Sequence, residues 1–151
     1  MYTCLQKYND KIKVGQTRLI LNSRFGLPLG VQTTSFLVAG FYSLSMAESQ
    51  LEDLPTATRK TLPPQDPVPV ARLSRLAVDK TCQGQRMGEL LLMNALASCA
   101  RIAGEIGTVG IIVDAKHEQA QRFYLKYGFT PYTTKPLTLF IPMQTVMQSL
   151  P

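Results

Sequence analysis

The hydrophobic positions of this chain follow two patterns, one typical of strands and one typical of helices. Short runs of β-branched, aromatic or continuously apolar residues predict strands, and they lie at 17–21, 33–46, 70–78, 109–113 and 137–141. Apolar residues spaced three and four apart predict helices, and helical character occurs over 2–13, 49–59, 84–103 and 117–127. The run over 109–113 is apolar throughout, which suits a strand buried on both faces.

Glycines and prolines mark the expected interruptions. Residues 22–29 predict a loop, and Gly40 is a candidate bulge within its strand. Four prolines within 62–70 exclude a helix and favour an extended connection. Gly104 is the expected C-cap of the longest helix, and Gly128 closes the next one. The alternation of strands and helices in the second half predicts an α/β or α+β sheet covered by helices, in a single domain over 1–151.

Composition narrows the classes of partner. The chain has 151 residues, a formal net charge of +6 and a pI near 9.4, so anionic partners such as nucleic acid, phosphorylated cofactors or acidic proteins are favoured. Three cysteines and the single His117 do not form a metal-binding pattern, and we expect reduced thiols in a cytoplasmic protein. Neither a signal peptide nor an apolar run long enough to span a membrane is evident.

The segment over 79–88 is a candidate anion site because it joins a predicted strand to the start of a helix. The first amides of a helix lack partners within the helix, and the helix dipole favours negative charge there. Gly84 and Gly88 would let a phosphate approach the backbone closely. Many strand–helix turns contain glycines and bind nothing, and neither standard nucleotide-binding glycine pattern is present.

A second candidate is Tyr124, on the helix predicted over 117–127. Phe123 and Tyr127 are four residues apart and share a helix face. Tyr124 lies about 100° away from Phe123 around the axis and can point into a site. The alternative is a core tyrosine whose hydroxyl is satisfied, which is the commoner situation.

Together the two segments resemble the GNAT acetyltransferase superfamily. Its acetyl-CoA motif, [Q/R]-x-x-G-x-[G/A] between a central strand and a helix, corresponds to QGQRMG at 83–88. Its F-Y-x-x-x-G-F element corresponds to residues 123–129. The chain is most similar to the GNAT toxins of bacterial toxin–antitoxin pairs, through YSLS at 42–45, PVPV at 67–70, RLSRLAVD at 72–79 and PLTLFIP at 136–142.

The resemblance implies a GNAT acyl-CoA N-acyltransferase fold with a central mixed sheet, and acetyl-CoA as the acetyl donor. It places the donor where the strands over 70–78 and 109–113 splay apart, with Tyr124 protonating the departing thiolate. The cofactor-binding residues that it implies are Leu76, Ala77, Val78, Gln83, Gly84, Gln85, Arg86, Met87 and Gly88. No metal is expected. On sequence grounds no carboxylate base is evident; His117 is a candidate base or, as the simpler reading, a surface histidine that begins a helix.

In the toxin branch the acceptor is the amino group of an aminoacyl-tRNA, and its acetylation blocks translation. Arg72 and Arg75 are then expected to meet acceptor-stem phosphates. The branch also implies a small ribbon-helix-helix antitoxin as partner. A homodimer of this chain is possible on sequence grounds and stays undecided.

The chain departs from the family at two places. Arg86 stands where the motif has its central glycine, and its side chain either crowds the loop or adds a phosphate contact. Family members usually begin with a further strand and helix, and we expect this chain to start at what is normally the second helix, around 2–13. Three alternatives stay open: a GNAT enzyme that acetylates a protein or small-molecule amine, a non-catalytic copy that keeps only partner binding, and a plain nucleic-acid-binding module.

Overall fold

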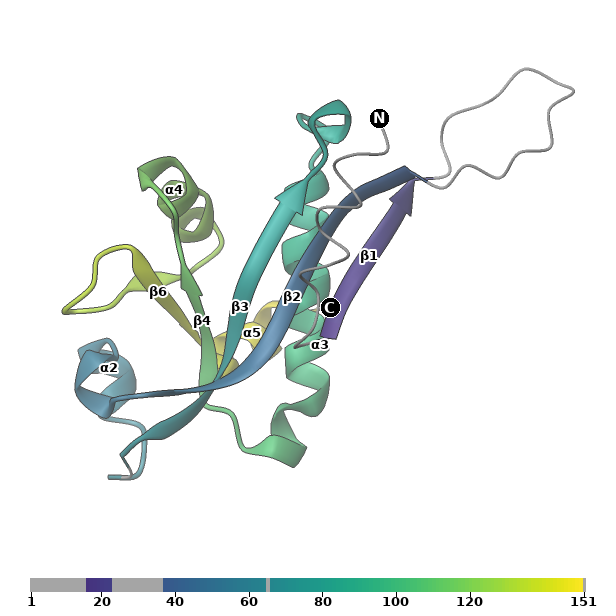
Figure 1. Ribbon diagram of the computed structural model, residues 1–151. Coiled ribbons are helices and arrows are strands. Elements are labelled where there is room, and N and C mark those ends of the chain that lie inside the picture. The colour runs from purple at the N-terminus through teal and green to yellow at the C-terminus, as the bar shows by residue number, and fades with distance from the viewer. Residues whose placement is uncertain (1–15, 23–36, 65, 151) are drawn as a thin grey trace, which may run out of the picture.

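The computed structural model describes residues 16–22, 37–64 and 66–150, which form one mixed sheet with helices packed on it (Figure 1). The strands are β1 (Gln16–Asn22), β2 (Leu37–Ser49), β3 (Val68–Val78), β4 (Gly110–Asp114), β5 (Thr130–Pro131) and β6 (Thr138–Pro142). Within this described part, their order across the sheet is β1-β2-β3-β4-β6-β5. The neighbours β3 and β4 are parallel, and the other neighbouring pairs run antiparallel. The predicted mixed α/β fold is therefore confirmed.

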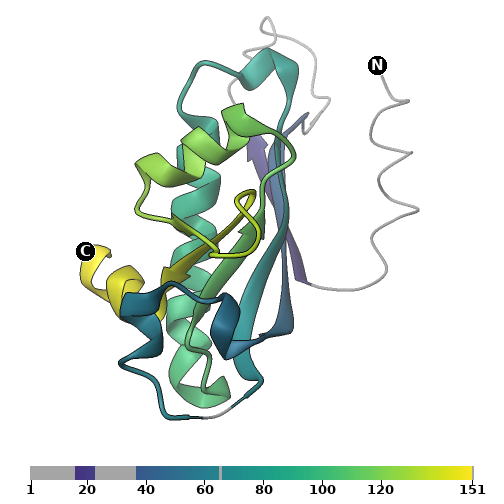
Figure 2. The same cartoon turned by 90° about the vertical axis from the view of Figure 1, so that its left-hand side faces the viewer.

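The helices surround this sheet. They are α2 (Thr56–Arg59), α3 (Met87–Ile106), α4 (Glu118–Lys126) and α5 (Met143–Ser149), with short 3-10 turns η1 (Leu51–Asp53) and η2 (Lys80–Cys82). Figure 2 shows α3, α4 and α5 on the same side of the long strands. Parallel neighbours need a crossover connection, and α3 supplies the one that joins β3 to β4. Of the helices in the described ranges, none is long and apolar enough to cross a membrane.

Alternating residues of the central strands fill two cores, one on each face of the sheet. Ile111 and Val113 belong to the larger core, which also takes the buried side chains of α3, α4 and α5. Ile112 belongs to a smaller core on the opposite face, with Leu54 and Phe140. This confirms the prediction of a strand buried on both faces, because successive side chains of a strand point to opposite faces.

The expected strands are confirmed, and the register of β1 against β2 shifts beside Gly40, as predicted. The expected helix over 49–59 is wrong in its extent. The strand β2 continues to Ser49, and Pro55 separates η1 from the four-residue α2 because proline lacks the backbone N–H that a continuous helix needs.

The bounds of α3 also differ from the prediction. The helix continues past Gly104 to Ile106, and Gly107 ends it in the left-handed conformation, with a φ of 65°. Sequence patterning missed β5 and α5. The helix α5 begins directly after Pro142, and its buried residues are Met143 and Val146. The predicted helix over 2–13 and nearly all of the predicted loop over 22–29 lie outside the described residues.

Two glycines test this packing. A Cβ atom on Gly110 would lie 2.4 Å from the Phe140 ring and 2.5 Å from the Ile141 carbonyl oxygen. We therefore expect Gly110→Ala to lower the free energy of unfolding by about 3 kcal/mol, measured by urea denaturation. Gly104 has no atom within 4 Å of such a Cβ and lies inside α3, so Gly104→Ala is expected to raise stability by about 0.5–1 kcal/mol. Equal effects of the two changes would contradict the packing described for β4 and β6.

Candidate active site

The parallel neighbours β3 and β4 stay paired over only a short stretch. Residues 71–73 of β3 pair with residues 111–113 of β4. The strand β3 continues to Val78, whereas β4 ends at Asp114, and the two separate toward the top of Figure 1. On the side facing β4, residues 74–78 therefore have no partner strand among the described residues. Their backbone groups on this edge can pair with an extended ligand, as an added strand would.

A β-bulge lies at the point where β3 leaves β4. Ser43 of β2 faces Arg75 and Leu44 faces Leu73, so Ser74 is an extra residue on β3. A bulge leaves one residue out of the regular ladder and redirects its backbone groups. The backbone N–H groups around Ser74 are therefore available at this point to a ligand that reaches the end of the unpaired edge.

The bulge also decides which side chains share a face of the sheet. Leu73 and Leu76 both pack on the larger core, although three residues separate them along the strand. Strict alternation would put them on opposite faces of the sheet, but the extra residue Ser74 places both on the same face. Arg72 and Arg75 therefore share the other face of the sheet.

These two arginines are in different electrostatic situations. Arg72 forms an ion pair with Asp114, the last residue of β4, and Thr138 donates a second hydrogen bond of 2.8 Å to the same carboxylate. Arg75 is exposed on the part of β3 beyond the pairing with β4. Of the pair, Arg75 is therefore the one that offers an exposed cation on the unpaired segment.

The loop between β3 and α3 has the features that the predicted anion site requires. Asp79 accepts hydrogen bonds from the Thr81 hydroxyl and backbone N–H, at 2.5 and 2.9 Å, and these bonds lower the pKa of its carboxyl group. Gly84 and Arg86 both have positive φ angles, 76° and 59°, and α3 begins directly afterwards. The amides of the first turn of this 20-residue helix have no partners within the helix.

Tyr124 lies on α4 in the larger core, with only 7% of its surface exposed. The Phe129 ring packs edge-on against it at a centroid distance of 5.5 Å. Burial raises the pKa of Tyr124, and within the described chain no charge or hydrogen bond contributes to the shift. The phenol therefore stays protonated at neutral pH. The ring is therefore a core aromatic, and the catalytic role of the hydroxyl stays a prediction.

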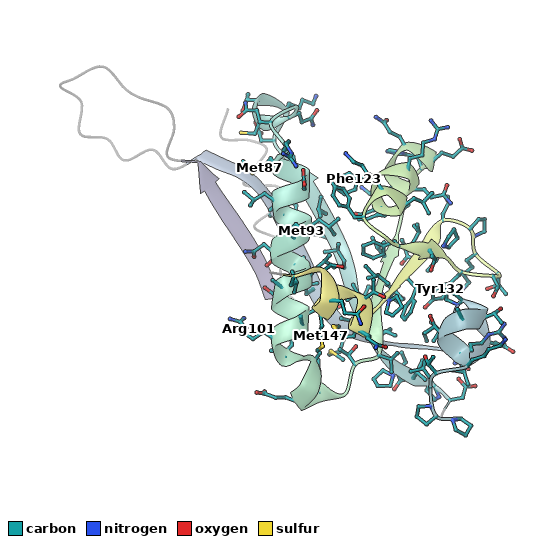
Figure 3. All side chains as sticks on the ribbon, turned by 180° about the vertical axis from the view of Figure 1, so that it is seen from behind. Met87, Met93, Arg101, Phe123, Tyr132 and Met147 are labelled. Carbon is teal, nitrogen blue, oxygen red and sulfur yellow. The ribbon has the colours of Figure 1, made fainter. Side chains whose placement is uncertain are left out.

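Phe123 connects the tyrosine to the anion loop. Its ring packs against Tyr124 at 5.2 Å and Tyr127 at 5.1 Å. A Cβ atom on Gly88 would lie 3.7 Å from the same ring, so α4 reaches the first turn of α3 at this point. Figure 3 shows Phe123 between the two helices. The predicted cofactor loop and the predicted catalytic tyrosine are thus connected through Phe123, which lies close to Gly88 and packs against Tyr124.

A cavity of about 350 Å³ lies on the opposite face of the sheet, next to the end of the β3–β4 pairing. Its lining combines Ile112 with polar and charged side chains: Glu48, Ser49, Gln50, Asp53, Arg72, Asp114, Tyr132, Lys135 and Thr138. Tyr132 and Ser49 are each 6% exposed and form a hydrogen bond of 2.7 Å. The cavity therefore has a fixed polar wall beside Arg72 and Asp114.

His117 is the N-cap of α4: its Nδ1 accepts a hydrogen bond of 3.2 Å from the Ala120 amide. This geometry favours the reading of an exposed histidine that begins a helix. Cys82 and Cys99 are buried, and burial raises the pKa of Cys99 to about 11. Over residues 16–22, 37–64 and 66–150, no group of histidine, cysteine and acidic side chains is arranged to hold a metal ion.

Comparison with known proteins identifies the family. The sequence model described as "Acetyltransferase (GNAT) domain" matches residues 64–145, more than half of the chain, including β3, the anion loop and Tyr124. The chain belongs to the GNAT acetyltransferase family. The resemblance inferred from the motifs is thereby confirmed.

Two curated relatives are toxins. The chain is 41% identical over 107 residues to the tRNA-acetylating toxin of Mycobacterium tuberculosis (strain ATCC 25618 / H37Rv), covering 71% of this chain and 63% of the relative. It is 30% identical over 116 residues to the probable toxin TacT of Sinorhizobium fredii (strain NBRC 101917 / NGR234), covering 72% and 64%. The chain thus matches less than two thirds of the length of these relatives.

Solved structures of toxins share the fold. A mutant of KacT superposes with a TM-score of 0.77 at 26% identity, over 95% of this chain and 78% of that one. AtaT complexed with acetyl-methionyl-tRNAfMet gives a TM-score of 0.77 at 25% identity, over 95% and 79%.

Against the GNAT motif, Arg86 now has a structural explanation. The motif's central glycine falls on a residue with a positive φ, where side chains are disfavoured and glycine is not. The Arg86 side chain is 82% exposed and donates two hydrogen bonds to Glu89, at 2.7 and 2.8 Å. It is therefore turned along α3, and it does not crowd the loop.

Glu89 is an acid in the first turn of α3, where a bound anion would be repelled by a free carboxylate. The hydrogen bond from Arg86 lowers the pKa of Glu89, and a hydrogen bond from Tyr127 acts in the same direction. The arginine therefore neutralises an acidic side chain beside the anion loop.

The structure brings the predicted cofactor residues together, since Leu76, Ala77 and Val78 form the unpaired edge of β3 and lead directly into the loop over 83–88. Sequence reasoning missed the bulge at Ser74 and the carboxylates around the cavity. Those carboxylates come from β2, η1 and β4, so no spacing along the chain could have revealed that they meet.

The backbone conformation at Arg86 gives a prediction about stability. Arg86→Ala and Arg86→Gly both remove the ion pair with Glu89, but only alanine keeps a Cβ at positive φ. We expect the glycine variant to be more stable than the alanine variant by about 1 kcal/mol in urea denaturation. An alanine variant as stable as the glycine variant would show that residue 86 does not hold this conformation in solution.

Proposed function

We propose that this protein is an acetyl-CoA-dependent N-acetyltransferase that acetylates the amino group of an aminoacyl-tRNA and so blocks translation as a toxin. The observation that supports it best is the unpaired edge of β3, which runs from the anion loop to the bulge at Ser74. The two curated relatives carry matching names, tRNA-acetylating toxin and probable toxin TacT.

The residues present fit the acetyl donor. The free amides over 84–88 would hold the diphosphate at the positive end of α3. Leu76, Ala77 and Val78 would hold the pantetheine arm through backbone hydrogen bonds, as a strand is held in a sheet. Acetyl-CoA, when bound, supplies an acetyl thioester, which this placement puts near Ser74. The redirected N–H groups of the bulge would there face the thioester carbonyl oxygen and stabilise developing negative charge.

Tyr124 would supply the proton that the departing CoA thiolate needs. The acceptor amine would form the new bond to the acetyl carbon as the bond from carbon to sulfur breaks, and the phenol would donate its proton to sulfur. The proton that the acceptor nitrogen loses would restore the phenol through solvent. Burial supports this role, since it raises the pKa of Tyr124 and keeps the phenol protonated. An α-amine has a pKa of about 7.7–8.0, so a useful fraction is neutral without a strong base.

Arg75 and the overall charge of +6 support a polyanionic substrate. The solved structure of AtaT with acetyl-methionyl-tRNAfMet provides a precedent in a protein of the same fold. AtaT has also been solved with the C-terminus of its antitoxin AtaR and acetyl-CoA. We therefore include a small antitoxin of the ribbon-helix-helix class as a partner, and the cytoplasm, where charged tRNA is used, as the location.

The role of Tyr124 can be tested with labelled acetyl-CoA and total charged tRNA. Tyr124→Phe is expected to lower label transfer to the aminoacyl group by at least about 100-fold, because the acid is lost. Calorimetry should show acetyl-CoA binding within about twofold of wild type, because loss of the proton donor affects the chemical step and not the binding of acetyl-CoA.

The matched control is Tyr42→Phe. It removes a buried hydroxyl that donates to Asn94 at 2.6 Å, from a tyrosine that packs against α3. Equal label transfer by wild type and Tyr124→Phe, with Tyr42→Phe also active, would remove Tyr124 from the proposed chemistry.

The proposed phosphate contact gives a further expectation. Arg75→Gln should weaken tRNA binding and reduce the slope of log K against log salt concentration by about one. The control is Arg101→Gln, because Arg101 is an exposed arginine that projects from α3 (Figure 3). Identical salt slopes for wild type and Arg75→Gln would exclude a phosphate contact at this residue.

A further inference from the structure

The cavity beside Arg72 and Asp114 is adjacent to the place where the proposed acetyl group would arrive. Arg72 is next to the last β3 residue that pairs with β4, and Asp114 ends β4. The anion loop and Tyr124 belong to the α3 face of the sheet, whereas Ile112 of the cavity faces the smaller core on the other side. The proposed donor and the cavity would thus meet near the end of the β3–β4 pairing from opposite faces of the sheet.

The charges of the cavity differ in sign from the protein as a whole. Its lining holds the carboxylates of Glu48, Asp53 and Asp114 and the cations of Arg72 and Lys135. The protein carries a formal charge of +6, so a net negative cavity is a local reversal. A phosphate group would be repelled there, and an ammonium or another hydrogen-bond donor would be attracted.

The carboxylates are not equivalent. Asp114 is neutralised by Arg72 and also accepts from Thr138. Asp53 accepts a hydrogen bond of 2.6 Å from the Thr134 hydroxyl, which holds it at the rim. Glu48 is exposed at the end of β2, and no cation is among its contacts in the described part of the chain. Glu48 is therefore the carboxylate with the most freedom to meet a ligand.

From this arrangement we infer that the cavity receives the amine-bearing end of the acceptor, and that Glu48, with Asp53, selects aminoacyl groups with a cationic side chain over aliphatic ones. The inference rests on the proposed function and adds a substrate class to it. The volume of about 350 Å³ is within the range of small-molecule sites. Inside the cavity a cation-bearing side chain would meet carboxylates, while an aliphatic one would leave the polar wall unpaired.

The test compares acetylation of lysyl-tRNA and isoleucyl-tRNA by the full chain with acetyl-CoA. Wild type should show the higher kcat/KM on lysyl-tRNA. Glu48→Gln should lower that value about fivefold, the size expected for an exposed ion pair, and leave the value for isoleucyl-tRNA unchanged. Glu105→Gln, an exposed acid on α3 outside the cavity, is the control that should change neither.

Preference of the wild type for isoleucyl-tRNA, or an equal loss on both substrates in Glu48→Gln, would overturn the inference. The same comparison with lysinamide and isoleucinamide as acceptors tests the inference independently of the tRNA proposal. Selectivity for lysinamide that depends on Glu48, without any acetylation of tRNA, would refute the tRNA substrate and uphold the cavity. Acetylation of both tRNAs with no side-chain preference would uphold the tRNA substrate and refute the selection by the cavity.

Discussion

The proposed active site depends on the point at which the pairing of β3 with β4 ends. A backbone N–H or C=O inside a protein needs a hydrogen-bond partner, and in a regular sheet the next strand supplies it. Here β3 extends five residues, 74–78, beyond its pairing with β4, and the bulge at Ser74 lies at the start of this unpaired segment. The result is an edge inside the sheet rather than at its margin, with one end at the loop over 83–88 and the other at the bulge.

Charge is distributed in agreement with this geometry. The loop offers unpaired amides at the positive end of α3, and Arg86 neutralises the nearby Glu89. Tyr124 is kept protonated by burial alone. On the other face, Arg75 is an exposed cation, while the cavity beside Asp114 is net negative. A donor rich in phosphate and an acceptor that ends in an amine would thus meet surfaces of opposite sign.

Much of this could be predicted from the sequence because the decisive signals are local. The apolar run over 109–113 and the glycines at 84 and 88 act within single elements, and the structure has the central strands and helices where they predict. The rest depends on contacts between distant segments. The bulge at Ser74 is visible only in the register against β2, and Arg86 at a motif glycine acquires meaning only from its φ of 59°. The sequence could not show whether Gly104 or Gly107 ends α3, since both glycines come after the last buried residue of the helix, Ala103.

The most direct test of the account is amide hydrogen exchange on the full chain, with and without acetyl-CoA. We predict that binding slows exchange at residues 74–78 of β3 and at the loop over 84–88, because the ligand supplies the missing partners of these backbone groups. Binding that leaves both segments as exchangeable as before, with protection elsewhere, would contradict the claim that the unpaired edge of β3 holds the acetyl donor.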